Sequence, residues 1–193
     1  MKTMKYFGML VMGAIMAFGF TACGSDDDDN GGGGGGSRAT ASVTINGTTF
    51  GVSNAYWNIE TANQNDTFYE LTLMNCNWPN VSDPLMSIGI IYHVKDGSTA
   101  QMLSGEFDDY QVAVSLVSQD ETKDKSYIAY SKLDDNSGKL KVTISGNSVT
   151  VQVPALKYYN GFESSTTTYP GGAFSFTGSM SKLPETANFY SLD

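Results

Sequence analysis

Apolar residues alternate with polar ones along much of residues 38–193, and no long segment repeats them every 3.6 positions. In the clearest case, six apolar residues flank Gly146-Asn147 at alternate positions: Leu140, Val142, Ile144, Val149, Val151 and Val153. A two-residue turn at Gly146-Asn147 pairs Ile144 with Val149, and this register places all six side chains on one face. The pattern therefore predicts a β-hairpin that buries this face.

Similar patterns predict strands in the rest of the domain. We expect a first hairpin over residues 42–52, with its turn at Asn46-Gly47. Further strands are expected at residues 66–76, 85–94, 102–107, 110–118, 126–133 and 172–183. About nine strands then follow one another along the chain. The predicted fold class is all-β, either an antiparallel sandwich or an up-and-down, lipocalin-like barrel, and the sequence leaves both closures open.

Composition agrees with strands and excludes one class of partner. Tyr, Phe, Ser, Thr, Gly and Val are frequent after the N-terminal segment, which favours strands and turns. Acidic side chains outnumber basic ones by 20 to 11, for a formal net charge of −9. Such a surface repels phosphate backbones, so we expect no nucleic-acid partner.

The first 22 residues have the layout of an export signal. Lys2 and Lys5 form a basic head, and residues 6–20 are apolar and uncharged. This run is too short to span a bilayer, which needs about 20 residues. It ends in Phe20-Thr21-Ala22-Cys23, a large apolar residue and two small ones before a cysteine. We therefore expect cleavage before Cys23 and attachment of a diacylglycerol to its sulfur.

The residues after Cys23 carry a resemblance to a known class. Gly24-Ser25 is followed by four acidic residues: Asp26, Asp27, Asp28 and Asp29. Residues 1–30 thus resemble surface lipoproteins of the Bacteroides type, in which an acidic run after the acylated cysteine directs display outside the outer membrane. The resemblance implies an outer-membrane protein, lipid-anchored and facing the extracellular side. The alternative is that the four Asp only solvate a tether that stays in the periplasm.

The resemblance and the composition together predict the domain organisation. Gly31–Gly36 form a glycine run, which favours a flexible linker. We expect a signal at residues 1–22, a lipidated tether at 23–37 and a single domain at 38–193. Many small lipoproteins of this type have all-β bodies, which agrees with the predicted class.

A search for catalytic chemistry assigns no catalytic residue, metal or cofactor. His93 is the only histidine, and Cys76 has no internal partner once Cys23 is acylated, so a zinc site cannot be assembled. We expect Cys76 to act as a small buried apolar residue. Asp108-Asp109 and Asp134-Asp135 offer oxygen ligands for calcium, but neither has the spacing of a complete calcium loop, and turns also favour aspartate.

Aromatic residues are the remaining candidates for ligand binding. They occur in four groups, at or near expected strand ends and loops: Tyr56-Trp57, Asn77-Trp78-Pro79, Tyr158-Tyr159 and Tyr169. Flat rings beside amides and carboxylates suit sugars, whose apolar face stacks on a ring while polar groups bind the hydroxyls. We take Trp57, Trp78, Tyr158 and Tyr159 as candidate ligand-binding residues. The alternative is that Trp57 and Trp78 fill the core.

These observations favour a non-enzymatic binding or accessory module that is tethered at the cell surface. A glycan is the expected ligand, by analogy with the glycan-handling lipoproteins of related organisms. One alternative is a structural or adhesin-type domain that binds a surface protein. The other is a glycoside-acting hydrolase, which requires two carboxylates at close range.

Overall fold

The computed structural model describes residues 41–63, 66–77, 84–117, 127–132, 135–136, 138–160 and 168–183. The signal, Cys23, the run Asp26–Asp29 and Trp78 lie outside these residues. The regular elements among these residues are all β-strands. No helix among them is long and apolar enough to cross a membrane. The all-β expectation is confirmed for this part of the chain.

Thirteen strands are formed by the described residues. They are β1 (Ala41–Ile45), β2 (Thr48–Val52), β3 (Asn54–Asn63), β4 (Asp66–Met74), β5 (Leu85–Lys95), β6 (Gly105–Phe107), β7 (Tyr110–Val117), β8 (Tyr127–Tyr130), β9 (Leu140–Ser145), β10 (Ser148–Val153), β11 (Leu156–Asn160), β12 (Thr168–Gly171) and β13 (Phe174–Lys182).

All of these strands belong to one sheet, in the order β2-β1-β12-β11-β8-β7-β5-β4-β3-β13-β10-β9-β6. The end strands β2 and β6 are not hydrogen-bonded to each other, so the described sheet is open. The expected sandwich would contain two sheets, and in the expected barrel the first and last strands would be hydrogen-bonded to each other. About nine strands were predicted. The described strands form instead a single curled sheet, a half-barrel with more strands than the alternation pattern revealed.

Strand β13 joins the two halves of this sheet. Its first part pairs antiparallel with β10, from Phe174 opposite Val153 to Ser179 opposite Ser148. Its last three residues pair with β3, with Met180 opposite Ala55. The pairing with β3 is the one parallel contact among the described strands.

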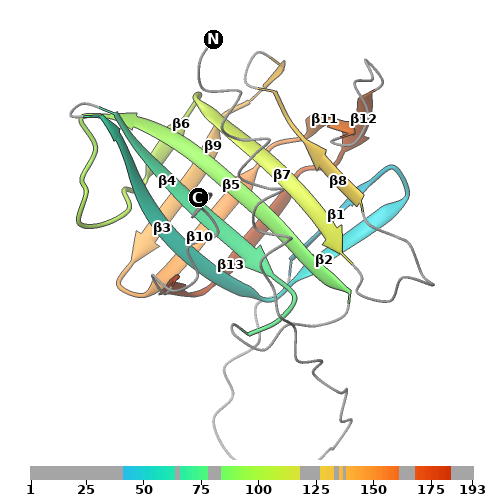
Figure 1. Ribbon diagram of the computed structural model, residues 1–193, viewed down its shortest axis with the longest axis horizontal. Helices are drawn as coiled ribbons and strands as arrows, with labels where there is room; N and C mark the ends of the chain where they lie inside the picture. Colours follow the sequence, from blue (N-terminus) through green and yellow to red (C-terminus); the bar gives the residue numbers. More distant parts are fainter. Residues whose placement is uncertain are drawn as a thin grey trace, which may run out of the picture.

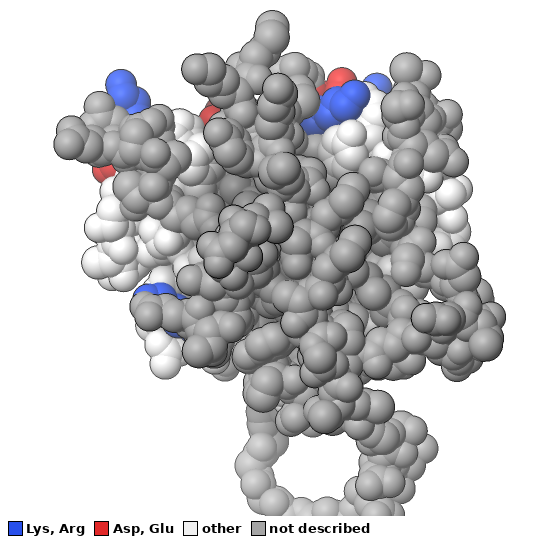
Figure 2. Space-filling model, in the orientation of Figure 1, with Lys and Arg blue, Asp and Glu red and all other residues white. Residues whose placement is uncertain are grey.

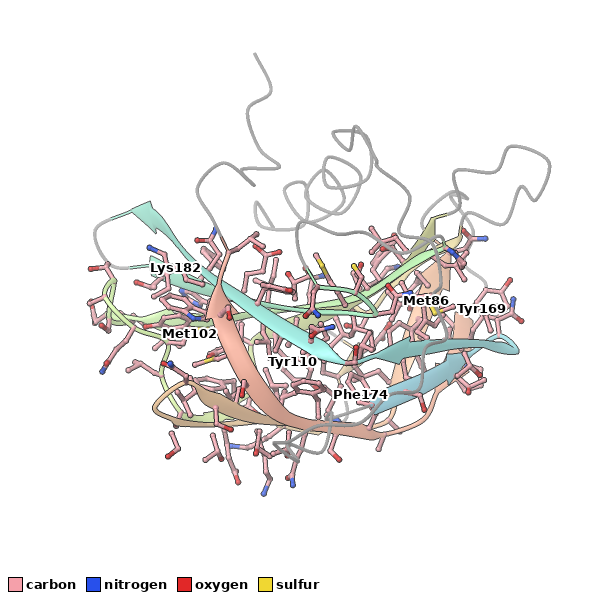
Figure 3. The ribbon with its side chains drawn as sticks, turned by 90° about the horizontal axis from the view of Figure 1, so that it is seen from below. Met86, Met102, Tyr110, Tyr169, Phe174 and Lys182 are labelled. Atoms are coloured by element: carbon pink, nitrogen blue, oxygen red, sulfur yellow. The ribbon has the colours of Figure 1, made fainter. Side chains whose placement is uncertain are left out.

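The curl brings distant strands face to face. Strands β3, β4, β5, β7 and β8 lie in front of β13, β10 and β9 in Figure 1, and Figure 3 shows side chains filling the space between these two halves. The hairpin of β1 and β2 packs across the interior, because β2 contacts β5 and β1 contacts β13 although neither pair is adjacent in the sheet.

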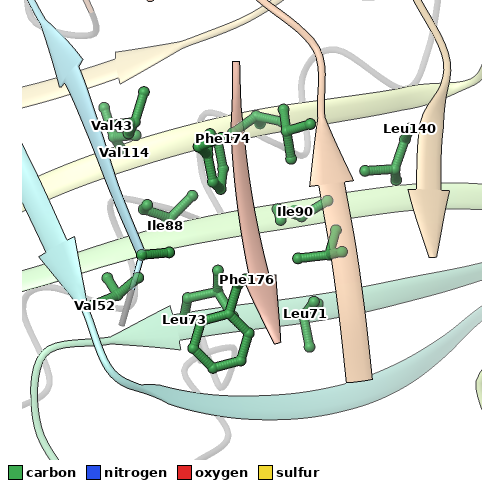
Figure 4. Close-up of a cluster of buried hydrophobic side chains, with 14 of the residues drawn as sticks. Val43, Val52, Leu71, Leu73, Ile88, Ile90, Val114, Leu140, Phe174 and Phe176 are labelled. Atoms are coloured by element: carbon green, nitrogen blue, oxygen red, sulfur yellow. The ribbon is translucent and has the colours of Figure 1, made fainter. Parts of the chain in front are cut away.

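The core lies on the concave side of this curl. Apolar side chains from β4 and β5 meet those from β13 and from the β1–β2 hairpin (Figure 4). Eight core side chains, from these strands and from β7, are at most 1% exposed: Ile45, Phe50, Leu71, Leu73, Ile88, Ile90, Val114 and Phe176. Burial of such apolar surface is the dominant favourable contribution to folding.

Both predicted hairpins form in the expected register. Val149 pairs with Ile144 and Val151 with Val142, as the alternation predicted. The first hairpin turns at Asn46 and Gly47, whose φ angles of 49° and 76° match the I′ turn that an Asn-Gly pair favours. Strand-like alternation next to a tight turn therefore sufficed to predict these pairings.

Three strands were not predicted, namely β3, β11 and β12. Strand β3 contains three asparagines, Asn54, Asn58 and Asn63, a residue type that is depleted in strands. It forms because β4 and β13 pair with it on both sides. The expectation was that Tyr56, Trp57, Tyr158 and Tyr159 lie at or near strand ends and loops. They belong to strands that were not predicted, Tyr56 and Trp57 to β3 and Tyr158 and Tyr159 to the last part of β11.

A row of tyrosines closes one end of the core. Tyr69, Tyr92 and Tyr110 lie directly opposite one another on β4, β5 and β7. Each buried ring donates its hydroxyl to a loop carbonyl: Tyr69 to Ser98 at 2.8 Å, Tyr92 to Leu103 at 3.1 Å, and Tyr110 to Gly138 at 2.8 Å. The rings thus fill the core while their hydroxyls hold the loops that cover it.

Gly171 is expected to be intolerant of any side chain. A Cβ there would lie 2.3 Å from Cε2 of the buried Tyr158 ring, whereas a Cβ at neighbouring Gly172 would meet nothing within 4 Å. Gly171→Ala should lower the free energy of unfolding by about 1–3 kcal/mol, and Gly172→Ala should change it by less than about 0.5 kcal/mol. Urea unfolding followed by circular dichroism measures both; equal effects of the two variants would contradict this packing.

The buried tyrosines should make the fold sensitive to alkali. Burial raises the pKa of Tyr69, Tyr92 and Tyr158 above the ordinary value of 10.0, and it raises the pKa of Tyr110 to about 12. The folded state therefore retains phenolic protons that the unfolded state loses above pH 10, so the free energy of unfolding should fall as pH rises from 10 through 12. Below pH 10 this contribution is constant.

Phenolate absorbance and circular dichroism, recorded over the same alkaline titration, check this expectation. The exposed tyrosines should ionise first, and the buried group should ionise together with the loss of the β signal. Independent titration of all eleven tyrosines near pH 10 with an intact β signal would contradict it.

Candidate functional site

Two partly exposed tyrosines stand side by side on the outer face of the sheet. Tyr130 of β8 lies directly opposite Tyr159 of β11, and their ring centroids are 6.1 Å apart with an interplanar angle of 27°. Each ring is adjacent in sequence to a core residue, Ala129 or Tyr158, which is fully buried. The period of two in a strand therefore turns Tyr130 and Tyr159 away from the core. We call these two residues the tyrosine pair.

Polar groups surround the tyrosine pair. The ammonium nitrogen of Lys132 lies 3.6 Å from the centroid of the Tyr159 ring, a cation–π contact. The hydroxyl of Tyr159 donates a short hydrogen bond to Oδ2 of Asp135. This bond, followed by smaller effects of burial and of nearby Asp135 and Tyr130, raises the pKa of Tyr159, so its hydroxyl stays protonated at neutral pH.

One side of the Tyr130 ring has no bulky neighbour directly across the sheet. On the side of β7 the residue opposite Tyr130 is Ala113, whose side chain is a single methyl group. The next residue in the same row is Gly89 of β5, where an added Cβ would meet nothing within 4 Å. The tyrosine pair thus stands beside small side chains on the β7 side, but Ala113 itself is buried, so this position does not form open surface.

Trp57 has a different environment from the tyrosine pair. It lies in β3 opposite Leu71, on the side of the strand that packs against the core, and its side chain is half-buried. The Lys182 ammonium lies 5.7 Å from its ring centroid. Trp57 therefore contributes to the edge of the core and presents only part of its ring outward.

Tyr158 is fully buried in the core, so a surface site at its neighbour Tyr159 does not include it. Its hydroxyl has no hydrogen-bond partner among the described residues, and neither has the buried Oδ1 of Asn136. The amide nitrogen of Asn136 donates to the Tyr110 carbonyl at 2.8 Å. Cys76 is buried, as expected.

The histidine and the acidic pairs do not form one cluster. Nδ1 of His93 lies 2.9 Å from Oδ2 of Asp109, at a solvent-accessible position beside the Phe68 ring. Asp108 lies 3.4 Å from the Lys139 ammonium instead, and Asp134 is outside the described residues. Within the described part of the chain, no three His, Cys, Asp or Glu side chains are placed to hold a metal ion.

Charged side chains also occur elsewhere among the described residues, in the contacts Lys139–Asp108 and Lys141–Glu106. Among the described residues visible in Figure 2, basic and acidic side chains lie toward the periphery of the view.

Comparisons of the sequence with family models and curated proteins, and of the fold with solved structures, found no match.

The site that these residues form was partly predictable. Tyr159 was a candidate from the sequence, and alternation along residues 126–133 placed Tyr130 on the face opposite Ala129. Lys132 was not a candidate, and Asp135 was considered only as a calcium ligand or turn residue. The strand β11 was not predicted, and nothing in the sequence brought residue 159 to residues 130–135. The pairing of β11 with β8 is the signal that was missing.

Proposed function

We propose that this chain is a lipid-anchored surface protein whose β domain binds glycans without acting on them. The observation that carries the glycan proposal is the tyrosine pair, with Lys132 and Asp135 beside it. Partly exposed aromatic rings provide the surface on which the apolar face of a sugar stacks. The ammonium and carboxylate supply a donor and an acceptor for hydroxyl groups at the rim.

The protonation state of Tyr159 supports a neutral recognition chemistry. Its phenol is uncharged at physiological pH and donates its one proton to Asp135, so its oxygen is available to a ligand as an acceptor. Its bond to Asp135 also restrains the ring, so less conformational entropy is lost when a ligand binds. Stacking on a ring that is already held in place favours binding of a sugar from a dilute solution.

The anchoring part of the proposal rests on the sequence. Cys23 follows an apolar signal and precedes Asp26–Asp29 and a glycine run. Acylation of Cys23 would hold the domain at the outer membrane, and the acidic run would direct it outward. The expected tether, residues 24–37, would reach about 20 Å if it behaves as a random coil, and this would let the binding domain sample nearby surfaces.

Removal of a ring from the tyrosine pair is expected to weaken glycan binding. On an array of plant, mucin and microbial glycans, Tyr159→Ala and Tyr130→Ala should each weaken the wild-type signal by about tenfold or more, equivalent to ~1.4 kcal/mol. Tyr159→Phe should retain more binding than Tyr159→Ala, since it keeps the ring and loses only the bond to Asp135.

Phe68→Ala is the matched control, because Phe68 is another partly exposed aromatic residue, on β4 beside His93. It should leave glycan binding unchanged, and circular dichroism should show that every variant is folded. Silence of the wild-type protein on all glycan classes, or equal loss in Phe68→Ala, would remove the glycan proposal.

Substitution of the expected acylation site tests the anchor separately. In a host with a lipoprotein export pathway, Cys23→Ser should move the protein from the membrane fraction to the soluble fraction. Replacement of Asp26–Asp29 by alanine should leave it in the membrane fraction but protect it from protease added outside the cell. A membrane-bound Cys23→Ser variant, or mass spectrometry showing an unmodified thiol at Cys23, would contradict lipid anchoring.

A further inference from the structure

The two ends of the open sheet differ in their protection. Strand β6 has only three residues, and Glu106 on it pairs with Lys141 at 2.8 Å. The hydrogen bond and charge of Lys141 lower the pKa of Glu106, so this edge keeps its charge. Short length and charge are two ways in which proteins prevent an edge strand from pairing with another chain.

Strand β2 at the other end has neither protection. It is the five-residue segment Thr48–Val52, without charge, proline or an irregularity in its register with β1. The whole hairpin, residues 41–52, contains no charged side chain. Strand β2 is hydrogen-bonded only to β1 among the described strands.

The register of the hairpin identifies which backbone groups face outward. With the two-residue turn, Ile45 with Thr48 and Val43 with Phe50 are the pairs that exchange hydrogen bonds. Thr49 and Gly51 lie between these pairs, so their N–H and C=O groups point away from β1. No described residue bonds to these outward backbone groups.

We propose that β2 is a self-association edge, which pairs antiparallel with β2 of a second copy of this chain about a two-fold axis at Phe50. In this register Thr49 of each copy lies opposite Gly51 of the other. The outward N–H and C=O of each residue then bond to those of the opposite residue. The contact is isologous, because the same residues contribute from both copies.

The side chains on this edge fit the two-fold register. Thr49 and Gly51 are on the same outer face, because the buried Phe50 and Val52 alternate with them. An added Cβ at Gly51 would meet nothing within 4 Å, so there is open space for the branched side chain of Thr49 from the second copy. A β-branched residue opposite glycine avoids the crowding that two large side chains would cause.

The absence of charged side chains on this hairpin favours contact between two copies at this edge. Each chain carries a formal net charge of −9, so two copies repel one another in general. The uncharged hairpin removes that repulsion locally and leaves backbone groups to be satisfied. The contact is small, so we expect a weak dimer, with a dissociation constant above about 10 μM.

Sedimentation velocity over a range of concentrations tests the dimer, with the full chain kept in a non-ionic detergent because residues 6–20 are apolar. The wild-type mass should rise toward that of two copies. Thr49→Pro removes the outward N–H of β2 together with the hydroxyl that contacts Thr44, and Gly51→Lys places like charges beside the two-fold axis. Both variants should remain monomeric at concentrations where the wild type dimerises.

Thr44→Lys is the matched control. Thr44 lies on β1 opposite Thr49, and their hydroxyl oxygens are 3.0 Å apart. A lysine at position 44 therefore adds the same charge as Gly51→Lys on the same face of the hairpin, but not on the edge strand. This variant should dimerise like the wild type, and unchanged thermal unfolding should show that all variants fold. A monomeric wild type at every concentration, or dimerisation of both edge variants, would overturn the proposal.

Amide exchange observed by nuclear magnetic resonance locates the contact. The N–H groups of Thr49 and Gly51 should exchange quickly in dilute samples and slowly in concentrated ones. The Phe50 N–H is bonded to Val43 within the hairpin and should be protected at both concentrations. Protection of Thr49 and Gly51 only after addition of an extended peptide, with the chain alone unprotected, would replace the second copy by a strand-donating partner.

Discussion

The architecture depends on strand β13, which pairs with β10 along its first part and with β3 at its end. The first part of β13 pairs with β10, and its last three residues, Met180 to Lys182, pair with β3 in parallel. Without the second pairing, β9, β10 and β6 would form a separate sheet. Because the two pairings occur at successive positions of one strand, the sheet bends there, and its two halves face each other across the core.

The tyrosine row sets the limit of that core. Aliphatic side chains fill the middle of the curl, but an end of a half-barrel must also accommodate the polar backbone of its loops. Tyr69, Tyr92 and Tyr110 meet both needs, because each ring is buried while each hydroxyl bonds to a loop carbonyl. A phenylalanine row would fill the same volume but leave those carbonyls without donors.

The alternation that places apolar side chains in the core also determines which side chains lie on the outer face. Tyr158 packs inward and Tyr159 outward because they are consecutive residues of β11. Pairing of β11 with β8 then sets Tyr159 beside Tyr130 and within reach of Lys132. Sheet register therefore holds the two rings of the proposed glycan site before any ligand binds, whereas Lys132 and Asp135 lie outside the strands, between β8 and β9.

The sequence by itself determined the class of secondary structure and both hairpins, since residues close in the chain carry the alternation and the turn chemistry that specify them. It also predicted an export signal that ends at an acylation site, Cys23, a prediction that depends on local sequence and not on tertiary contacts. Only the tertiary structure decided that β3 is a strand, that β11 lies beside β8, and that β13 bridges two half-sheets. These pairings join residues far apart in the chain, and asparagine-rich β3 is stabilised by partners rather than by its own propensity. Local patterns do not specify which distant strand will pair with a given strand. The sequence therefore identified Tyr159 as a candidate but did not predict which residues surround it.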